Sequence, residues 1–183
     1  MRLFIAIDIP LPLKETIVRA IEPFKYCGLD ATWVAQENIH MTVKFLGETR
    51  EELLSGIKTT LKQVSAGHAA LHAQLTEFGF FPDTRRPRIF YIGTDNELAL
   101  RNIAYEIEEN LEVLGFKQEN RFRAHLTLAR FKSDHNLPRF HEKLKSVKVT
   151  GTIPVTALGL VKSTLSRTGP TYETLWETPL KNY

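Results

Sequence analysis

Two copies of a His-x-Thr-x pattern carry the residues best suited to chemistry. They are His40 with Thr42 and His125 with Thr127, offset by 85 residues. Residues two apart on a strand point to the same face, so each copy would place an imidazole beside a hydroxyl. Two such pairs facing each other supply a general acid, a general base and two hydroxyl donors, which suits chemistry on a phosphate ester.

Histidine titrates near pH 6.5 when unperturbed, so one imidazole can be neutral while the other is protonated. The neutral ring could activate water and the protonated ring could protonate a leaving oxygen. The threonine hydroxyls could donate to phosphoryl oxygens, and such a set needs no metal and no cofactor. The four histidines without a matching partner are interpreted as incidental: His68, His72, His135 and His141.

Polar side chains alternate with apolar ones through both motif runs, which is typical of half-buried strands. The polar positions are His40, Thr42 and Lys44 in the first run, and Arg121, Arg123, His125 and Thr127 in the second. We therefore expect each run to turn one polar face toward a shared cleft.

The elements around the motifs also occur twice. Arg2–Ile7 resembles Arg88–Gly93 with an offset of 86 residues, close to the offset of the motifs. Near-equal offsets in separate matches favour an internal duplication. We expect residues 1–183 to form a single bilobal domain whose halves begin near residues 1 and 88.

Apolar spacing predicts the helices. The expected helices cover 13–24, 53–64 (opened by a capping box at Thr49 and Glu52), 100–114 (stopped by Gly115) and 140–147, and the closing strands cover 71–80 and 152–161. Because the motif strands have one polar face, antiparallel or mixed sheets fit better than a parallel sheet. The predicted fold is α+β, bilobal and duplicated, with sheet-and-helix lobes around a central cleft.

Charge is distributed unevenly. Residues 121–162 hold nine Lys or Arg and two acids, whereas the whole chain has a net charge of +3. This favours an anionic ligand, with a solvated basic surface as the alternative.

The single cysteine, Cys27, excludes an internal disulfide and a cysteine zinc cluster. There is no membrane-length apolar run and no secretory signal, so we expect a cytoplasmic protein that does not enter membranes.

Further residues around the motifs resemble the 2H phosphoesterase superfamily, in particular the RNA 2′,3′-cyclic phosphodiesterases, also called 2′-5′ RNA ligases. The matches are Trp33-Val34, Asn38–His40, Phe45–Glu48, His125–Arg130, Ser163–Leu165 and Gly169–Glu173. The resemblance runs from Met1 to about Glu173.

This resemblance implies a cleft between lobes and hydrolysis of RNA 2′,3′-cyclic phosphate ends to 2′-phosphates. The roles it implies are His40 as proton donor, His125 as proton acceptor, Thr42, Thr127 and Arg130 as phosphate ligands, and Phe45 as a nucleotide contact. The substrate would be RNA, with tRNA fragments as one possibility, and the protein would be a monomer.

Two departures from the family pattern matter. Ala124 stands where the family commonly has proline, which would fix the local backbone. Arg130 lies an odd number of residues after His125, so on a regular strand the two side chains would point to opposite faces. A bulge after Thr127 would correct this, and otherwise Arg123 would be the better nucleotide or phosphate ligand.

Three alternatives stay open at the level of sequence. The same site could join a cyclic phosphate to a 5′-hydroxyl without ATP, as a 2′-5′ RNA ligase. A basic cleft could instead bind RNA or nucleotides without turnover. His40 and His125 could also be metal ligands, although no carboxylate or cysteine accompanies them at metal-ligand spacing.

Overall fold

The computed structural model describes residues 1–167 and 169–182. In chain order the elements are β1 (Arg2–Asp8), α1 (Leu11–Lys25), β2 (Ala31–Trp33), the 3-10 helix η1 (Gln36–Asn38), β3 (His40–Glu48), η2 (Glu51–Leu53), α2 (Leu54–Gly67), β4 (Leu71–Phe81), β5 (Ile89–Thr94), α3 (Glu97–Leu111), η3 (Glu112–Leu114), β6 (His125–Phe131), α4 (Leu137–Leu144), β7 (Thr152–Val155), β8 (Ala157–Ser166) and β9 (Gly169–Pro179).

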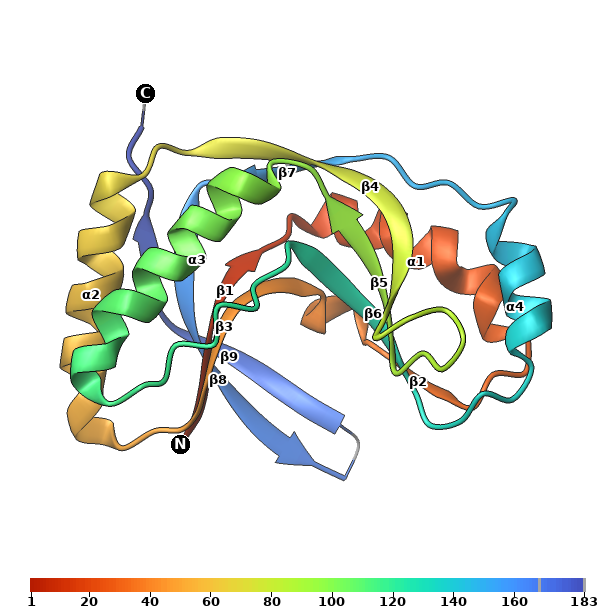
Figure 1. Cartoon of the computed structure of the whole chain (residues 1–183), viewed down its shortest axis with the longest axis horizontal. Helices are drawn as coiled ribbons and strands as arrows, with labels where there is room; N and C mark the ends of the chain where they lie inside the picture. The colour runs from red at the N-terminus through yellow and green to blue at the C-terminus, as the bar shows by residue number, and fades with distance from the viewer. Residues whose placement is uncertain (168, 183) are drawn as a thin grey trace.

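These strands form two antiparallel sheets, one ordered β3-β1-β8-β9 and the other β2-β6-β5-β4-β7. The motif strands β3 and β6 lie next to each other where the two sheets meet (Figure 1). The predicted α+β class, with antiparallel sheets around a cleft, is confirmed.

Both sheets combine strands from the two sequence halves. Strands β8 and β9 complete the sheet of β1 and β3, whereas β2 and β4 join the sheet of β5 and β6. Helices α2 and α3 pack against each other beside the four-stranded sheet, and α1 and α4 lie together beside the five-stranded sheet (Figure 1). The repeated sequence therefore does not divide into one sheet per half.

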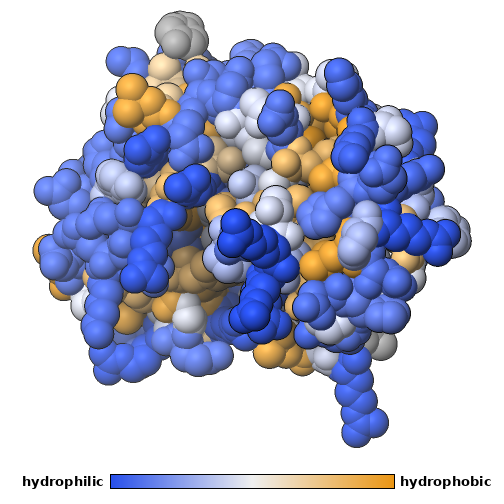
Figure 2. Space-filling model, turned by 45° about the vertical axis from the view of Figure 1, so that its right-hand side comes forward, coloured by the Kyte–Doolittle hydropathy of each residue, from blue (hydrophilic) through white to orange (hydrophobic). Residues whose placement is uncertain are grey.

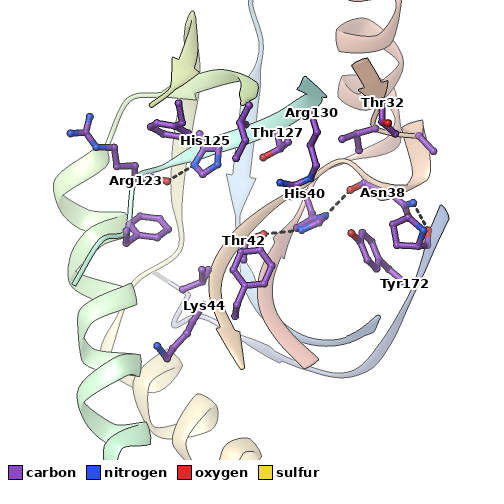
Figure 3. Close-up of a pocket in the computed structure, with 18 of the residues that line it drawn as sticks. Thr32, Asn38, His40, Thr42, Lys44, Arg123, His125, Thr127, Arg130 and Tyr172 are labelled. Atoms are coloured by element: carbon purple, nitrogen blue, oxygen red, sulfur yellow. Dashed lines mark hydrogen bonds between the residues drawn. The ribbon is translucent and has the colours of Figure 1, made fainter. Parts of the chain in front are cut away.

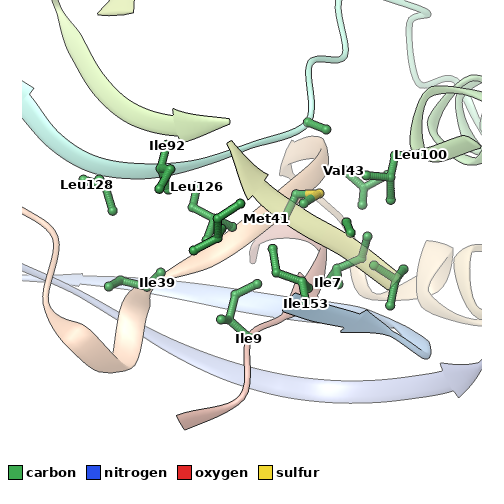
Figure 4. Packing of buried hydrophobic residues seen from close by; sticks show 14 of the residues in the cluster. Ile7, Ile9, Ile39, Met41, Val43, Ile92, Leu100, Leu126, Leu128 and Ile153 are labelled. Carbon is green, nitrogen blue, oxygen red and sulfur yellow. The ribbon is translucent and has the colours of Figure 1, made fainter. Parts of the chain in front are cut away.

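One continuous hydrophobic core joins the sheets and helices. Figure 4 shows Ile7 and Met41 of the four-stranded sheet close to Leu126 and Ile153 of the five-stranded sheet. All four side chains are at most 2% exposed. The two motif strands are thus fixed to a shared interior on their apolar sides, which leaves their polar sides to face the cleft.

Two of the predicted helices occur at the expected positions. Helix α1 buries Leu13, Ile17, Ile21 and Phe24 along one face, as the spacing predicted. Helix α3 continues through η3 to Gly115, whose φ of 88° is a left-handed conformation that glycine adopts at little cost.

Two helix boundaries were predicted wrongly. Thr49 does not cap α2, because its backbone N–H donates to the Met1 carbonyl and its hydroxyl donates to Gly47. A 3-10 turn follows, and α2 begins only at Leu54. Helix α4 ends at Leu144, so Val147 lies beyond it in a following turn.

Among the residues that the structure describes, no helix is long and apolar enough to cross a membrane.

Candidate active site

The two sheets enclose a cleft of about 630 Å³, which all seven predicted site residues line: His40, Thr42, Phe45, Arg123, His125, Thr127 and Arg130. Figure 2 shows a hollowed face on which hydrophobic side chains lie between rims of hydrophilic ones. The His-x-Thr-x pairs come together as the sequence predicted, from strands β3 and β6.

A β-bulge follows the threonine of each motif. The pairing of β1 with β3 skips Val43, and the pairing of β5 with β6 skips Leu128. Each bulge shifts the alternation of faces by one residue. Phe45 and Arg130, the fifth residues after the two histidines, are therefore exposed at the cleft, and the parity problem of Arg130 is resolved.

The first bulge also changes the position of Lys44, which was expected to share the polar face of His40 and Thr42. Lys44 is only 5% exposed, and its Nζ lies 3.0 Å from Glu108 Oε1. The same ammonium donates to the Lys117 carbonyl at 2.8 Å. Figure 3 shows Lys44 directed away from the imidazoles and toward α3. Lys44 thus lines the cleft as expected, but as a buried ion pair with Glu108 and not on the same face as His40 and Thr42, because a bulge interrupts the regular alternation.

Two hydrogen bonds orient the His40 ring. Nδ1 lies 2.7 Å from the Asn38 carbonyl and Nε2 lies 2.9 Å from Thr42 Oγ1 (Figure 3). Because a carbonyl only accepts, Nδ1 carries the proton of the neutral ring and Nε2 accepts from the Thr42 hydroxyl. Burial lowers the pKa of His40 to about 4, with Lys14 adding to the effect and the Asn38 carbonyl opposing it.

The His125 ring is held in the matching way. Its Nδ1 donates to the Arg123 carbonyl at 2.7 Å, and within residues 1–167 and 169–182 its Nε2 has no hydrogen-bond partner. Burial lowers the pKa of His125, and the Arg130 guanidinium lowers it further, whereas the Arg123 carbonyl and the Glu97 carboxylate raise it. His125 therefore carries a free, basic Nε2 in its neutral form.

Aromatic rings pack against both imidazoles. His40 lies 4.8 Å from Phe4 and 5.2 Å from Tyr172, between ring centroids. His125 packs edge-on against Phe81 and Tyr91, which lie on neighbouring strands of its own five-stranded sheet. These rings account for part of the burial that keeps the imidazoles neutral, and they restrict ring rotation.

Arg123 and Arg130 lie on opposite sides of His125 along the chain. Arg123 precedes β6 and contributes its carbonyl to His125, while its side chain is exposed at the cleft wall. Arg130 also lines the cleft, and its positive charge lowers the pKa of His125, an effect for which Arg123 is not a cause. Of the two guanidinium groups, Arg130 is the better placed to reach an anion held between the imidazoles.

The sequence did not single out Asn38 or Tyr172 as site residues. Asn38 is 9% exposed, and its Nδ2 donates to the Pro170 carbonyl at 2.8 Å. Asn38 therefore bonds to strand β9 through its side chain and to the His40 ring through its backbone carbonyl. The available signal was positional, because Asn38 and Arg123 both stand two residues before a motif histidine.

Comparisons with known proteins agree with this geometry. A family model described as the 2′-5′ RNA ligase superfamily matches residues 10–167. A Methanocaldococcus jannaschii protein named RNA 2′,3′-cyclic phosphodiesterase is 38% identical over 97% of this chain and 99% of its own length. A Thermotoga maritima protein of the same name is 32% identical over 97% of this chain and 94% of its own length.

A crystal structure of the Thermus thermophilus protein TT0787 superimposes with a TM-score of 0.79 at 26% identity, covering 100% of this chain and 99% of that one. The similarity in fold thus extends over the whole length of both proteins. With its two His-x-Thr-x strands in one cleft and relatives matched nearly end to end, the chain belongs to the 2′-5′ RNA ligase superfamily.

Proposed function

We propose that this chain hydrolyses 2′,3′-cyclic phosphate ends of RNA to 2′-phosphates by metal-independent acid–base catalysis. The observation that carries the proposal is the matched orientation of the two imidazoles. Each Nδ1 donates to the carbonyl two residues earlier, so in each ring Nε2 is the nitrogen available for acid–base chemistry, on His40 beside the Thr42 hydroxyl. The names of the Methanocaldococcus jannaschii and Thermotoga maritima relatives support the same reaction.

His125 acts as the general base in this mechanism. Its Nε2 takes a proton from water as the water oxygen bonds to phosphorus. The bond from phosphorus to O3′ breaks, and O3′ takes the proton held on His40 Nε2. The ring opens to a 2′-phosphate, and each positioned histidine contributes on the order of 10²–10⁴-fold in rate.

The phosphate oxygens are held by Thr42, Thr127 and Arg130. In the free protein the Thr42 hydroxyl donates to His40 Nε2. Once His40 is protonated, Nε2 no longer accepts a hydrogen bond, and the Thr42 hydroxyl is released to donate to the substrate. Protonation of the acid and binding of the phosphate therefore favour each other. Phe45 and Arg123 contact the nucleotides at the RNA end that carries the cyclic phosphate.

The test uses a short RNA ending in a 2′,3′-cyclic phosphate, with excess EDTA, followed by mapping of the product end. A 2′-phosphate is the expected product, whereas a 3′-phosphate would mean that the other ester bond breaks. Bound but unchanged RNA would indicate a binding module, and loss of activity that zinc restores would indicate a metal site.

Variants of the histidines separate catalysis from binding. His125→Ala and His40→Ala should each abolish turnover while leaving RNA binding largely intact. His40→Ala should regain rate on a substrate with a better leaving group, because such a group needs no protonation. Normal turnover by either variant would remove that residue from its proposed role.

Ligation is the second candidate, favoured by the family model that matches the chain. A 5′-hydroxyl would replace water as the nucleophile, His125 would still take its proton, and ATP would not be needed. Adding an excess of 5′-hydroxyl RNA to the same assay should then yield a joined product with a 2′-5′ linkage.

We also infer that residues 1–183 fold as one unit of duplicated origin that is monomeric and cytoplasmic, and that tRNA fragments are among its substrates. The large hydrophobic core that joins both sheets and the helices supports the single unit. One unfolding transition and a monomer mass by light scattering are expected. Sequencing the RNAs with cyclic phosphate ends that accumulate in cells lacking the protein would test whether tRNA fragments are among its substrates.

A further inference from the structure

A segment without regular secondary structure, residues 116–124, leads from η3 to His125. Side chains of α3 hold its backbone. The Tyr105 hydroxyl donates to the Asn120 carbonyl at 3.1 Å. Glu108 Oε2 accepts the backbone N–H groups of Glu119 and Asn120, at 2.9 and 2.8 Å. Contacts with this helix, together with the Lys44 ammonium that donates to the Lys117 carbonyl, therefore fix the path into the second motif.

The last of these contacts lies next to the catalytic histidine. Glu97, the first residue of α3, accepts the backbone N–H of Ala124 at 3.1 Å through its Oε2. Ala124 is 4% exposed, and the pairing of β5 with β6 begins at His125, one residue later. A buried backbone N–H beyond the end of a sheet needs another partner, and the Glu97 carboxylate supplies it.

The first half of the chain meets the same need differently. Ile39 precedes His40 as Ala124 precedes His125, and its N–H donates to the Gln36 carbonyl at 3.2 Å, within the turn of η1. The first motif is therefore anchored by its own backbone, whereas the second depends on a side chain from a helix.

The Glu97 carboxylate also brings charge to this position. Burial lowers the pKa of His125 and Arg130 of β6 adds to this, whereas the Arg123 carbonyl and Glu97 of α3 raise it. The charge of His125 also acts on His40 of β3, whose pKa it lowers. The ring of Tyr91, on β5, packs edge-on against the imidazole. Arg101 Nη2 lies 3.8 Å from the other oxygen of Glu97, so the carboxylate is only partly neutralised.

We propose that Glu97 is a positioning residue for His125. Its carboxylate fixes the backbone N–H adjacent to the histidine, and it keeps a negative charge beside the imidazole. The inference rests on the proposed function, in which His125 is the general base. A carboxylate on this side stabilises the imidazolium that forms when His125 takes the proton from water.

Two substitutions separate geometry from charge. Glu97→Gln keeps an oxygen that can accept the Ala124 N–H but removes the charge, whereas Glu97→Ala removes both. Glu109→Gln is the matched control, because Glu109 is exposed on the same helix. For each protein we would measure kcat and KM on cyclic-phosphate RNA across pH, and titrate His125 by NMR in the free protein.

Glu97→Gln should shift the acidic limb of kcat and the NMR midpoint of His125 to lower pH, with the plateau kcat retained within about twofold. Glu97→Ala should show the same shift and lose about tenfold in plateau kcat at an unchanged KM, because a displaced base is misaligned with its proton. Glu109→Gln should match the unsubstituted protein in all of these readouts.

An unchanged His125 midpoint in both Glu97 variants, or a plateau kcat in Glu97→Ala equal to that of the control, would overturn the inference. If Glu97→Ala fails to fold, the NMR midpoint of Glu97→Gln still decides the charge effect. If the unsubstituted protein turns over no RNA, the proposed function fails, yet the His125 titrations still show whether Glu97 acts on the imidazole.

Discussion

Protonation of His40 is the perturbation with the most direct consequences for this site. Burial lowers the pKa of His40 from 6.5 to about 4. At neutral pH, three units above that value, roughly one free molecule in a thousand holds the proton that the leaving oxygen needs. We therefore expect that substrate itself restores the proton, because an anionic phosphate beside His40 favours the charged ring.

The same shift predicts how stability depends on pH. The folded state resists protonation of His40, whereas the unfolded chain takes the proton near pH 6.5. Stability is therefore highest above about pH 6.5 and falls as the pH drops toward about 4. A difference of about 2.5 pKa units corresponds to a contribution of about 3 kcal/mol across that window.

Two assays check these values. Titration of the imidazole signals by NMR, assigned with His40→Gln, should give a His40 midpoint near 4 in the free protein and a higher midpoint with inorganic phosphate bound. Urea unfolding at neutral and mildly acidic pH should show a smaller loss of stability for His40→Gln than for the unsubstituted protein.

A His40 midpoint at the ordinary value in the free protein would refute the burial argument. A midpoint that stays low with phosphate bound would refute its consequence for the mechanism, because the acid would then lack its proton in the complex. Equal acid sensitivity of the two proteins in urea would mean that other groups dominate the pH dependence.

Three substitutions test other parts of the site. Lys44→Met should lower the free energy of unfolding by about 3–5 kcal/mol in urea titrations, because it leaves Glu108 charged and buried; pairing it with Glu108→Gln should recover part of the loss. Asn38→Ala should cost about 1–3 kcal/mol and speed amide exchange in β9, since the Pro170 carbonyl loses its donor. Arg130→Ala should lower kcat/KM about 10- to 100-fold, and its effect should shrink at high salt; an effect below twofold would exclude a phosphate contact.

Local patterns predicted the parts of the fold that depend on neighbours in sequence. The spacing of Leu13, Ile17, Ile21 and Phe24 gave one apolar face, and such a face specifies a helix wherever the rest of the core lies. The alternation at His40 and Thr42 likewise requires only that one side of the strand is buried. Both predictions held because they need no knowledge of the partner elements.

Sheet membership depends on distant partners, and the sequence did not predict it. Two matching halves favour two separate lobes, yet β8 and β9 join β1 while β4 joins β5. Nothing in the periodicity of a strand names the strand that will pair with it. The contact of Glu97 was missed for the same reason, because its hydrogen-bond partner, Ala124, lies 27 residues away in a segment without periodicity.

The repeat is preserved in backbone geometry and broken in chemistry. After each histidine the strand passes through the same bulge and the same order of buried and exposed positions. The fifth position then presents the ring of Phe45 in one half and the guanidinium of Arg130 in the other. A symmetric backbone thus gives the two imidazoles equivalent orientations, while unlike neighbours give them different electrostatic surroundings: Lys14 adds to the burial that lowers the pKa of His40, and Arg130 adds to the burial that lowers the pKa of His125. Burial keeps both rings neutral in the free protein, so the direction of proton transfer depends on the bound phosphate, which favours the charged form of His40 while His125 is left neutral to accept a proton from water.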